Sequence, residues 1–147
     1  MGEGLSELLT RDHRRCDSFW VDVDVAAQKG DREDIAGAWN RFETGLRRHL
    51  QMEEEIVFPA FESQTGITEG PTSVMRSEHQ QMRGLLDQMG ASLGAGDSEE
   101  LLDLGDTLLL LIQQHNLKEE QMLYPMAERA LTPRWPELRE ELEPFLA

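Results

Sequence analysis

The chain of 147 residues contains one cysteine, few aromatic residues, and fewer than half as many basic as acidic side chains. Because Cys16 has no second cysteine to pair with, no disulfide can form within the chain, and we expect it to be buried as a small apolar residue. Fourteen basic against 29 acidic residues give a formal net charge of −15. Nucleic acids and anionic membrane surfaces are negative themselves, so we expect neither as a partner.

Long hydrophobic runs and a targeting segment are also missing. The longest apolar run, residues 108–112, is far too short to span a bilayer. The N-terminal residues lack the basic start and the apolar core of a secretory signal. We therefore expect a cytoplasmic protein whose residues 1–147 form a single domain, long enough to bury a hydrophobic core.

Hydrophobic periodicity predicts four long helices and no strands. Apolar residues recur at alternating steps of three and four, which is the spacing of one helix face. The four predicted helices cover about residues 5–28, 31–62, 71–93 and 97–130. Long helices with short links pack most simply as an all-α, up-down-up-down four-helix bundle, here over about residues 5–130. A short extra helix is predicted over about residues 133–145. Its apolar residues are predicted to cap one end of the bundle: Trp135, Leu138, Leu142 and Phe145.

A duplicated stretch carries the histidines of the chain. Residues 49–62 read HLQMEEEIVFPAFE and residues 115–128 read HNLKEEQMLYPMAE, with five identical positions. The same offset of 66 residues places the Asp-His pair at 12–13 onto the Glu-His pair at 78–79. Each half thus contains two histidines, 36 residues apart, and one His-x-x-x-Glu motif. The pattern predicts a duplicated helical hairpin that builds a metal site.

The spacing also predicts that the histidines lie at one level of the bundle. His13 is 17 residues before the turn at Gly30 and His49 is 19 residues after it. At about 1.5 Å per residue, their heights along antiparallel helices differ by only about 3 Å. The second hairpin gives the same result, and one glutamate follows a histidine by one helical turn in each half. The same spacing of three and four residues, continued past residue 119, predicts that Met122 is buried as an apolar core residue. The six candidate metal ligands are His13, His49, Glu53, His79, His115 and Glu119.

Four imidazoles and two carboxylates inside a bundle suit a pair of first-row transition-metal ions. Carboxylates can bridge two ions, while neutral imidazoles fill terminal positions without adding charge. Iron is the expected metal, with manganese or zinc as substitutes. Single histidines on apolar faces are usually hydrogen-bonded core residues, but four at one level together with two glutamates favour a metal centre. Such a centre leaves room for a small ligand such as dioxygen, peroxide or nitric oxide.

The motifs resemble the hemerythrin-like, HHE cation-binding domains. The resemblance covers about residues 5–130 and includes the E-E-x-x-x-F/Y-P sequence of each repeat. It implies a non-haem, carboxylate-bridged pair of iron ions, with Glu53 and Glu119 as the bridges. It also implies that each iron binds two histidines: His13 and His49 on one, His79 and His115 on the other.

The function implied by this resemblance is the binding or sensing of dioxygen or a related small ligand. The alternative is a di-iron enzyme that consumes peroxide or acts in nitrosative-stress or iron–sulfur repair, and the residues leave enzyme activity open. The oxygen-carrying hemerythrins have a further histidine one turn after the one in the third helix, where this chain has Arg83. That departure argues against simple reversible oxygen carriage. Asp17, at the matching position of the first helix, is predicted to be a solvated surface residue.

Other residues near the motifs are predicted to have structural roles. Three acidic residues are expected on a solvated face: Glu54, Glu55 and Glu120. Tyr124 follows the second motif where Phe58 follows the first, so packing explains it as well as redox chemistry does. Pro59 and Pro125 are predicted to bend or end their helices just beyond the site.

Overall fold

The computed structural model describes residues 2–146, and within this range the chain is helical with no strand. The first hairpin consists of α1 (Leu5–Lys29), α2 (Arg32–Met52), the π-helical turn η1 (Glu53–Val57) and α3 (Phe58–Thr65). The second hairpin repeats this order as α4 (Pro71–Gly94), α5 (Ser98–Lys118), the π-helical turn η2 (Glu119–Leu123) and α6 (Tyr124–Leu131). A short 3-10 turn, η3 (Thr132–Arg134), leads into α7 (Trp135–Leu146).

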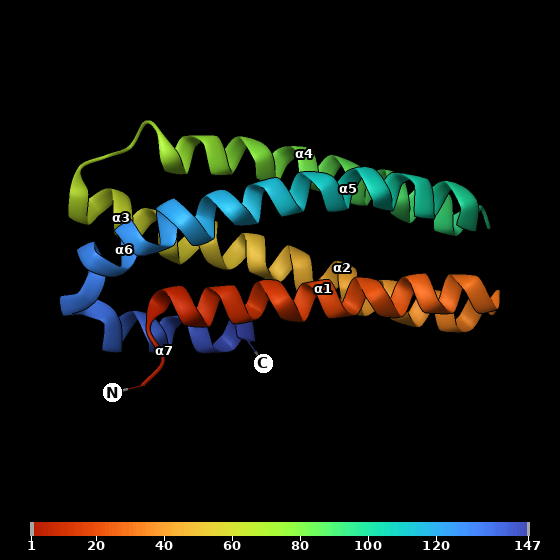
Figure 1. Cartoon of the computed structure of the whole chain (residues 1–147), viewed down its shortest axis with the longest axis horizontal. Helices are drawn as coiled ribbons and strands as arrows, with labels where there is room; N and C mark the ends of the chain where they lie inside the picture. The colour runs from red at the N-terminus through yellow and green to blue at the C-terminus, as the bar shows by residue number, and fades with distance from the viewer. Residues whose placement is uncertain (1, 147) are drawn as a thin grey trace.

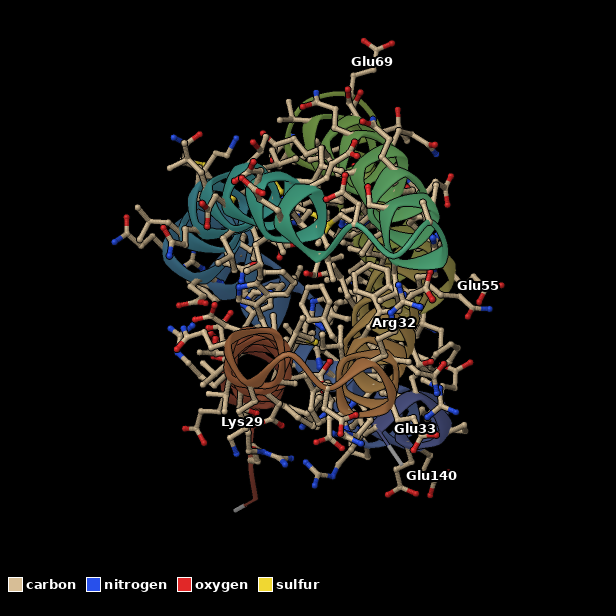
Figure 2. The ribbon with its side chains drawn as sticks, turned by 90° about the vertical axis from the view of Figure 1, so that its right-hand side faces the viewer. Lys29, Arg32, Glu33, Glu55, Glu69 and Glu140 are labelled. Carbon is tan, nitrogen blue, oxygen red and sulfur yellow. The ribbon has the colours of Figure 1, made fainter. Side chains whose placement is uncertain are left out.

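The two hairpins lie side by side and form the predicted up-down-up-down bundle (Figure 1). In each hairpin the second helix runs on through its π-helical turn, so the bundle has four long rods. Seen along the bundle axis, charged side chains such as Glu55 and Glu69 point outward around the packed interior (Figure 2). None of the helices within residues 2–146 combines the length and the apolar composition needed to cross a membrane.

Predicted start and stop signals position the helices. Gly30 ends α1 with a φ of 79°, a conformation that glycine adopts without steric cost. The side chain of Asp31 then accepts hydrogen bonds from the backbone N–H groups of Glu33 and Asp34, which have no partner within α2. Pro71 is the first residue of α4, where its missing N–H costs nothing. These signals set where each rod begins relative to its partner.

The two prolines after the histidine motifs change the helix without ending it. Before Pro59, the N–H of Phe58 bonds to the carbonyl of Glu53, five residues back, and Tyr124 bonds to Glu119 in the same way before Pro125. A proline ring clashes with the carbonyl four residues earlier in an α-helix, and a wider π-helical turn relieves that clash. Neither proline ends its helix, which continues as α3 or α6, and each half instead has one π-helical turn just before its proline.

Each π-helical turn adds one residue and rotates the buried seam. Met122, predicted to be buried, has 59% of its surface exposed, whereas Leu123 and Tyr124 are buried. In an unbroken α-helix the steps of three and four lead from residue 119 to residue 122. The extra residue of the π turn moves that seam one position further along the chain. The prediction for Met122 is therefore wrong.

The hydrophobic core consists of two clusters, one toward each end of the bundle. The first gathers residues of α1, η1, α3, η2, α6 and α7 together with Met52 of α2 and Met75 of α4, and the second gathers residues of α1, α2, α4 and α5. Leu138 and Leu142 of α7 are buried in the first cluster. The four residues predicted to cover one end of the bundle, Trp135, Leu138, Leu142 and Phe145, lie in or against this cluster, but α7 lies along the flank of α1 and α2 and not across the end (Figure 1).

Gly105 of α5 lets the helix backbone approach an aromatic ring, and its replacement is expected to destabilise the fold. A Cβ atom at this position would lie 2.3 Å from Cη2 of Trp20. The Trp20 ring is buried and packs against Phe42, with ring centroids 5.1 Å apart, so moving it would disturb the core packing. We expect Gly105→Ala to lower the free energy of unfolding by about 1–3 kcal/mol, measured by urea denaturation.

Gly84→Ala in α4 is the matched control. A Cβ atom there meets nothing within 4 Å, so alanine adds helix propensity without a clash. We expect this variant to be about 0.5–1 kcal/mol more stable than the wild type. A Gly105→Ala protein as stable as the wild type would show that the Trp20 ring adjusts freely.

Candidate metal centre

The six predicted ligands lie together in one layer between the two core clusters. His13 comes from α1 and His79 from α4, while each His-x-x-x-Glu motif spans the end of α2 or α5 and the start of its π-helical turn. None of the six has more than 3% of its surface exposed. The residue counts from each interhelical turn therefore predicted correctly that these side chains lie at one height along the bundle.

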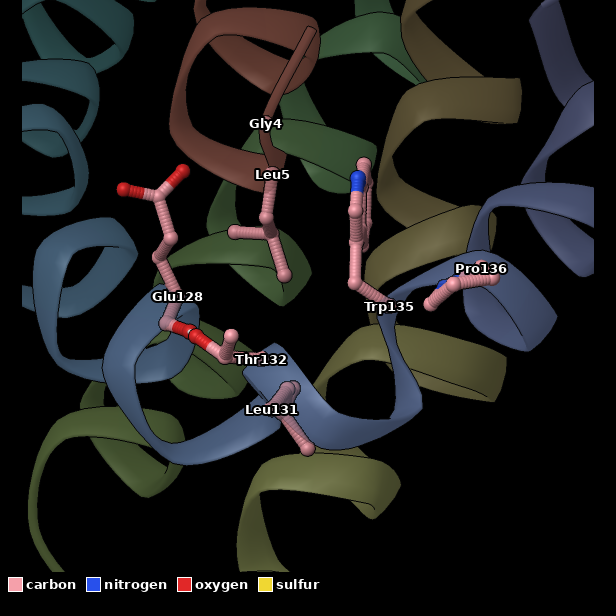
Figure 3. Close-up of a pocket in the computed structure, with 7 residues that line it drawn as sticks. All are labelled: Gly4, Leu5, Glu128, Leu131, Thr132, Trp135 and Pro136. Carbon is pink, nitrogen blue, oxygen red and sulfur yellow. The ribbon is translucent and has the colours of Figure 1, made fainter. Parts of the chain in front are cut away.

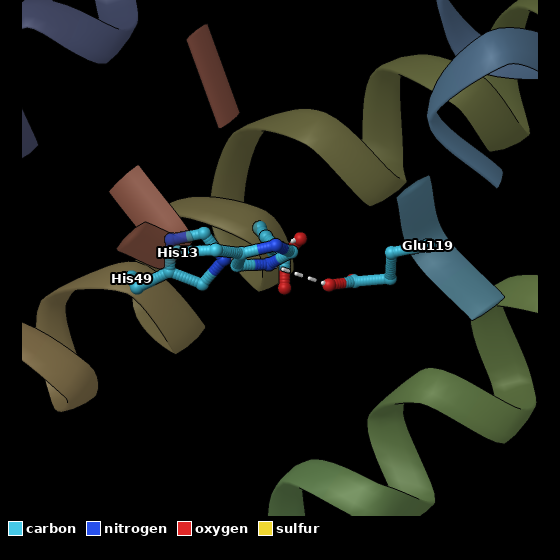
Figure 4. A group of neighbouring side chains, drawn as sticks. His13, His49 and Glu119 are labelled. Atoms are coloured by element: carbon cyan, nitrogen blue, oxygen red, sulfur yellow. Dashed lines mark hydrogen bonds and ion pairs between the residues drawn. The ribbon is translucent and has the colours of Figure 1, made fainter. Parts of the chain in front are cut away.

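The six side chains form two groups of four that share both glutamates. In each group every residue offers one nitrogen or oxygen atom, and the four atoms lie within 4.8 Å of one another. The first group contains His13, His49, Glu53 and Glu119, and the second contains His79, His115, Glu53 and Glu119. In the first group, Nε2 of His13 lies 3.0 Å from Oε1 of Glu119 (Figure 4). The carboxylates are thus placed between the two pairs of imidazoles.

Glu53 faces both groups with different oxygens. Its Oε2 lies 3.5 Å from Nε2 of His49, and its Oε1 lies 3.1 Å from Nε2 of His79. Oε1 of Glu119 likewise lies 3.0 Å from Nε2 of His13 and 3.2 Å from Nε2 of His115. A carboxylate that reaches two sets of nitrogens has the placement of a bridge between two cations.

Four buried atoms of this layer have no hydrogen-bond partner among the described residues, and they fit a bound cation. They are Oε1 of Glu53, Nε2 of His79, Nε2 of His115 and Oε2 of Glu119. All four belong to residues of the second group. A buried polar atom without a partner costs free energy, and a bound cation would supply the missing interaction. The residues present therefore fit a metal ion, because their nitrogen and oxygen atoms are suitable ligands and four of these atoms have no other partner.

The outward nitrogen of each histidine is held by a second carboxylate. Each Nδ1 lies 2.6–2.8 Å from one carboxylate oxygen: Glu120 for His13, Asp12 for His49, Glu54 for His79 and Glu78 for His115. Because an ionised carboxylate only accepts hydrogen bonds, Nδ1 carries the hydrogen and donates it. In the neutral imidazole, Nε2 then has a lone pair that points into the centre, as metal-binding histidines require.

Two of these acidic partners correct a sequence prediction. Glu54 and Glu120 were expected on a solvated face, yet they are the partners of His79 and His13. Each reaches across to the other hairpin, so its role depends on how the hairpins pack. Glu55, in contrast, is exposed as predicted. The sequence did contain a signal, because the glutamates at 54 and 120 are identical positions of the repeat.

A basic side chain neutralises each of the outer carboxylates. The pairs are Arg14 with Glu120, Arg15 with Asp12, Arg83 with Glu54, and Lys118 with Glu78. Burial opposes ionisation of Glu54, but Arg83 and His79 together hold the pKa of Glu54 below its usual value. Arg83, at the position of the missing histidine, thus contacts an outer carboxylate. Asp17 is 45% exposed and lies 3.5 Å from Arg14, as expected of a surface residue.

The inner carboxylates favour the protonated forms of His49 and His115 when no cation is present. Burial alone lowers the pKa of His115, but the Glu119 carboxylate, 3.2 Å from Nε2, and the charge of Glu53 raise that pKa to about 9. Burial is likewise outweighed at His49, whose pKa lies well above its ordinary value because of Glu53 and Asp12. The centre therefore has the negative potential that attracts a positive charge.

Tyr124 also faces the centre, and its role was left open between packing and redox chemistry by the sequence pattern. Its buried hydroxyl donates to Oε2 of Glu53 at 2.5 Å and lies 2.9 Å from Nε2 of His13. The π-helical turn brings it there, because residues five apart share a face in such a turn. Burial and the charges of Glu119 and Glu53 raise the pKa of Tyr124 well above its ordinary value. The side chain is thus a neutral phenol when no cation is bound.

Cys16 and the pocket near the N-terminus of α1 lie outside this centre. Cys16 is buried as predicted, and burial raises the pKa of its thiol to about 11. The pocket, of about 430 Å³, opens beside α7 (Figure 3). Its lining residues are Gly4, Leu5, Glu128, Leu131, Thr132, Trp135 and Pro136. This lining includes none of the six residues of the metal centre.

Comparison with known proteins agrees with the site. The chain is 32% identical over 131 residues to an uncharacterized hemerythrin-like protein of Schizosaccharomyces pombe. The match covers 87% of this chain, which spans 61% of the length of that relative. No solved structure matches the chain. The family model of the hemerythrin HHE cation binding domain matches residues 4–127. As its motifs predicted, the chain belongs to the hemerythrin HHE cation-binding domain family.

Proposed function

We propose that the buried centre holds two non-haem iron ions and that the protein binds or senses dioxygen or a related small ligand. The observation that carries this proposal is the pair of four-residue groups that share Glu53 and Glu119. Shared carboxylates suit a bridged metal pair, and imidazole nitrogen suits iron. Manganese or zinc fits the same atoms and serves as a substitute.

The surroundings of the centre support a small ligand. Core clusters lie toward both ends of the bundle, so bulk water is kept away from this layer. When bound, a ferrous pair would supply electrons and open coordination positions to dioxygen or peroxide. The outer carboxylates fix the imidazoles through Nδ1, so that Nε2 of each ring faces the centre, where it can bind a cation once it has lost any proton. The burial of the centre favours ligands of a few atoms over larger substrates.

We place the protein in the cytoplasm, with small molecules as its ligands. Its formal net charge of −15 opposes association with nucleic acids and anionic membrane surfaces, which are also negative. Among the acidic residues, those that hold the histidines are already paired with Arg14, Arg15, Arg83 or Lys118. The unpaired excess of negative charge therefore lies elsewhere on the chain.

Exposure of the anaerobic, ferrous-loaded protein to dioxygen tests the function. We expect the visible absorption spectrum to change on mixing, with the ions ending in a stable oxidised state. Because Arg83 contacts Glu54 and adds no nitrogen to the centre, we expect oxidation instead of reversible carriage. Stopped-flow absorption measures the change, and the zinc-loaded protein is the control because zinc has no redox chemistry.

The possible outcomes separate the functions. A colour that disappears when dioxygen is removed indicates reversible binding and overturns the expectation of oxidation. Sustained consumption of added peroxide supports the di-iron enzyme, which is the alternative function. A ferrous-loaded protein whose spectrum does not respond to dioxygen, peroxide or nitric oxide would contradict the proposed function.

A further inference from the structure

The two halves of the metal centre differ at one aromatic position. Tyr124 occupies the place in the second repeat that Phe58 occupies in the first, and the chain has no other tyrosine. The two rings are placed alike: Tyr124 stacks on His13 with ring centroids 5.4 Å apart, and Phe58 stacks on His79 at 5.5 Å, both at 27°. A single hydroxyl group therefore distinguishes the two positions.

The hydroxyl oxygen of Tyr124 lies among all four donor atoms of the first group. It is 2.9 Å from Nε2 of His13, 3.4 Å from Nε2 of His49, 2.5 Å from Oε2 of Glu53 and 3.0 Å from Oε1 of Glu119. Neighbouring ligands of an octahedral ion with bonds of about 2.1 Å are about 3.0 Å apart. The phenol oxygen thus has the separations expected of a ligand adjacent to each of the other four.

The second group has no equivalent atom. Its four residues each retain an atom without a hydrogen-bond partner, and Phe58 offers none. The tyrosine hydroxyl, in contrast, approaches both nitrogens of the first group. The asymmetry comes from one side chain, because the histidines and glutamates repeat in both halves.

We propose that Tyr124 is a fifth protein ligand of the ion held by His13, His49, Glu53 and Glu119. The inference rests on the proposed metal pair. As the bond from the phenol oxygen to the ion forms, the O–H bond breaks and the proton passes to solvent. The other ion keeps four protein ligands and a more open coordination sphere, so an added small ligand binds there first. Tyr124 thereby makes unequal two positions that the repeat would make alike.

Zinc titration of the metal-free protein tests this ligand without any redox chemistry. Since Tyr124 is the only tyrosine, phenolate absorption in the ultraviolet difference spectrum comes from it alone. We expect that absorption to appear with one of the two bound ions, together with the release of one proton more than in Tyr124→Phe. We expect Tyr124→Phe to weaken the binding of that ion at least tenfold and to leave the other unchanged. Phe58 shows that a phenyl ring fits this place in the fold.

Phe58→Tyr is the reciprocal variant, since it adds a hydroxyl at the matching position of the other half. We expect about twice the phenolate signal of the wild type, and two ions of more nearly equal affinity. Two zinc ions bound with no phenolate signal would overturn the inference and leave the metal pair intact. No zinc or iron bound at all would overturn the proposed function, and the inference with it.

Discussion

Replacing Glu119 by glutamine is expected to lower the metal content of the reconstituted protein from two ions to less than one ion per chain. Glu119 belongs to both four-residue groups, so the change removes a negative ligand from both positions at once. The amide keeps the shape of the side chain, so the helices should remain folded. Elemental analysis after removal of free metal measures the effect.

Glu55→Gln is the matched control for this experiment. Glu55 is exposed, and Gln121 already occupies the corresponding position of the second repeat. We expect this variant to hold the same metal as the wild type, although it loses the same charge. Circular dichroism shows whether each variant is helical. If a folded Glu119→Gln protein still binds two ions, Glu119 is not a shared ligand.

The affinity of the second group for a divalent ion is expected to rise steeply with pH. In the metal-free protein the pKa of His115 is raised from 6.5 to about 9, mainly by Glu119 acting against the effect of burial. An ion must displace that proton, so binding strengthens about tenfold per pH unit until the pKa is reached. From pH 6.5 to pH 9 this gives a rise of about 150-fold, since half of the His115 side chains are still protonated at the pKa. Competition with a chelator of known pH dependence measures it.

The metal-free protein should show the opposite trend in stability. The folded pKa of His115 lies above its unfolded value, so the protonated pair with Glu119 stabilises the fold below pH 6.5. That contribution is lost as the pH rises through about 9. The melting temperature of the metal-free protein should therefore fall over this range while the difference from the metal-loaded protein grows. A difference that shrinks with rising pH would argue that His115 is not a ligand.

The histidine partners of the outer carboxylates could not be predicted from the repeat. Helix periodicity places Glu54 and Glu120 beside the buried seam of their own helices, which is typical of a solvated position. Their partners, His79 and His13, lie on the other hairpin, and the contact between Glu120 and His13 joins residues 107 positions apart. No local sequence pattern indicates which helix packs against the face that carries Glu54 or Glu120. The packing of the two hairpins decides it.

The π-helical turns explain why Met122 was wrongly predicted to be buried and why the position of Tyr124 was not predicted. A count by threes and fours assumes that each residue rotates the helix by the same amount. The turns at Glu53–Val57 and Glu119–Leu123 break that assumption, so Met122 becomes exposed and Tyr124 enters the centre. The prolines at 59 and 125 indicated a disturbance at these places. Whether a helix ends, bends or widens at a proline depends on the neighbouring helices that hold both of its sides.

The sequence by itself determined the helices, the duplicated motif and the common level of the four histidines. These follow from the α-helix alone, because its rise and its residues per turn are nearly constant. Only the tertiary structure decided the partners of the outer histidine nitrogens, the position of α7 on the flank of α1 and α2, and the entry of the Tyr124 hydroxyl into one group. Each of these depends on how the side chains of different helices pack together. That packing is set by the shapes of helix surfaces that are far apart in the sequence.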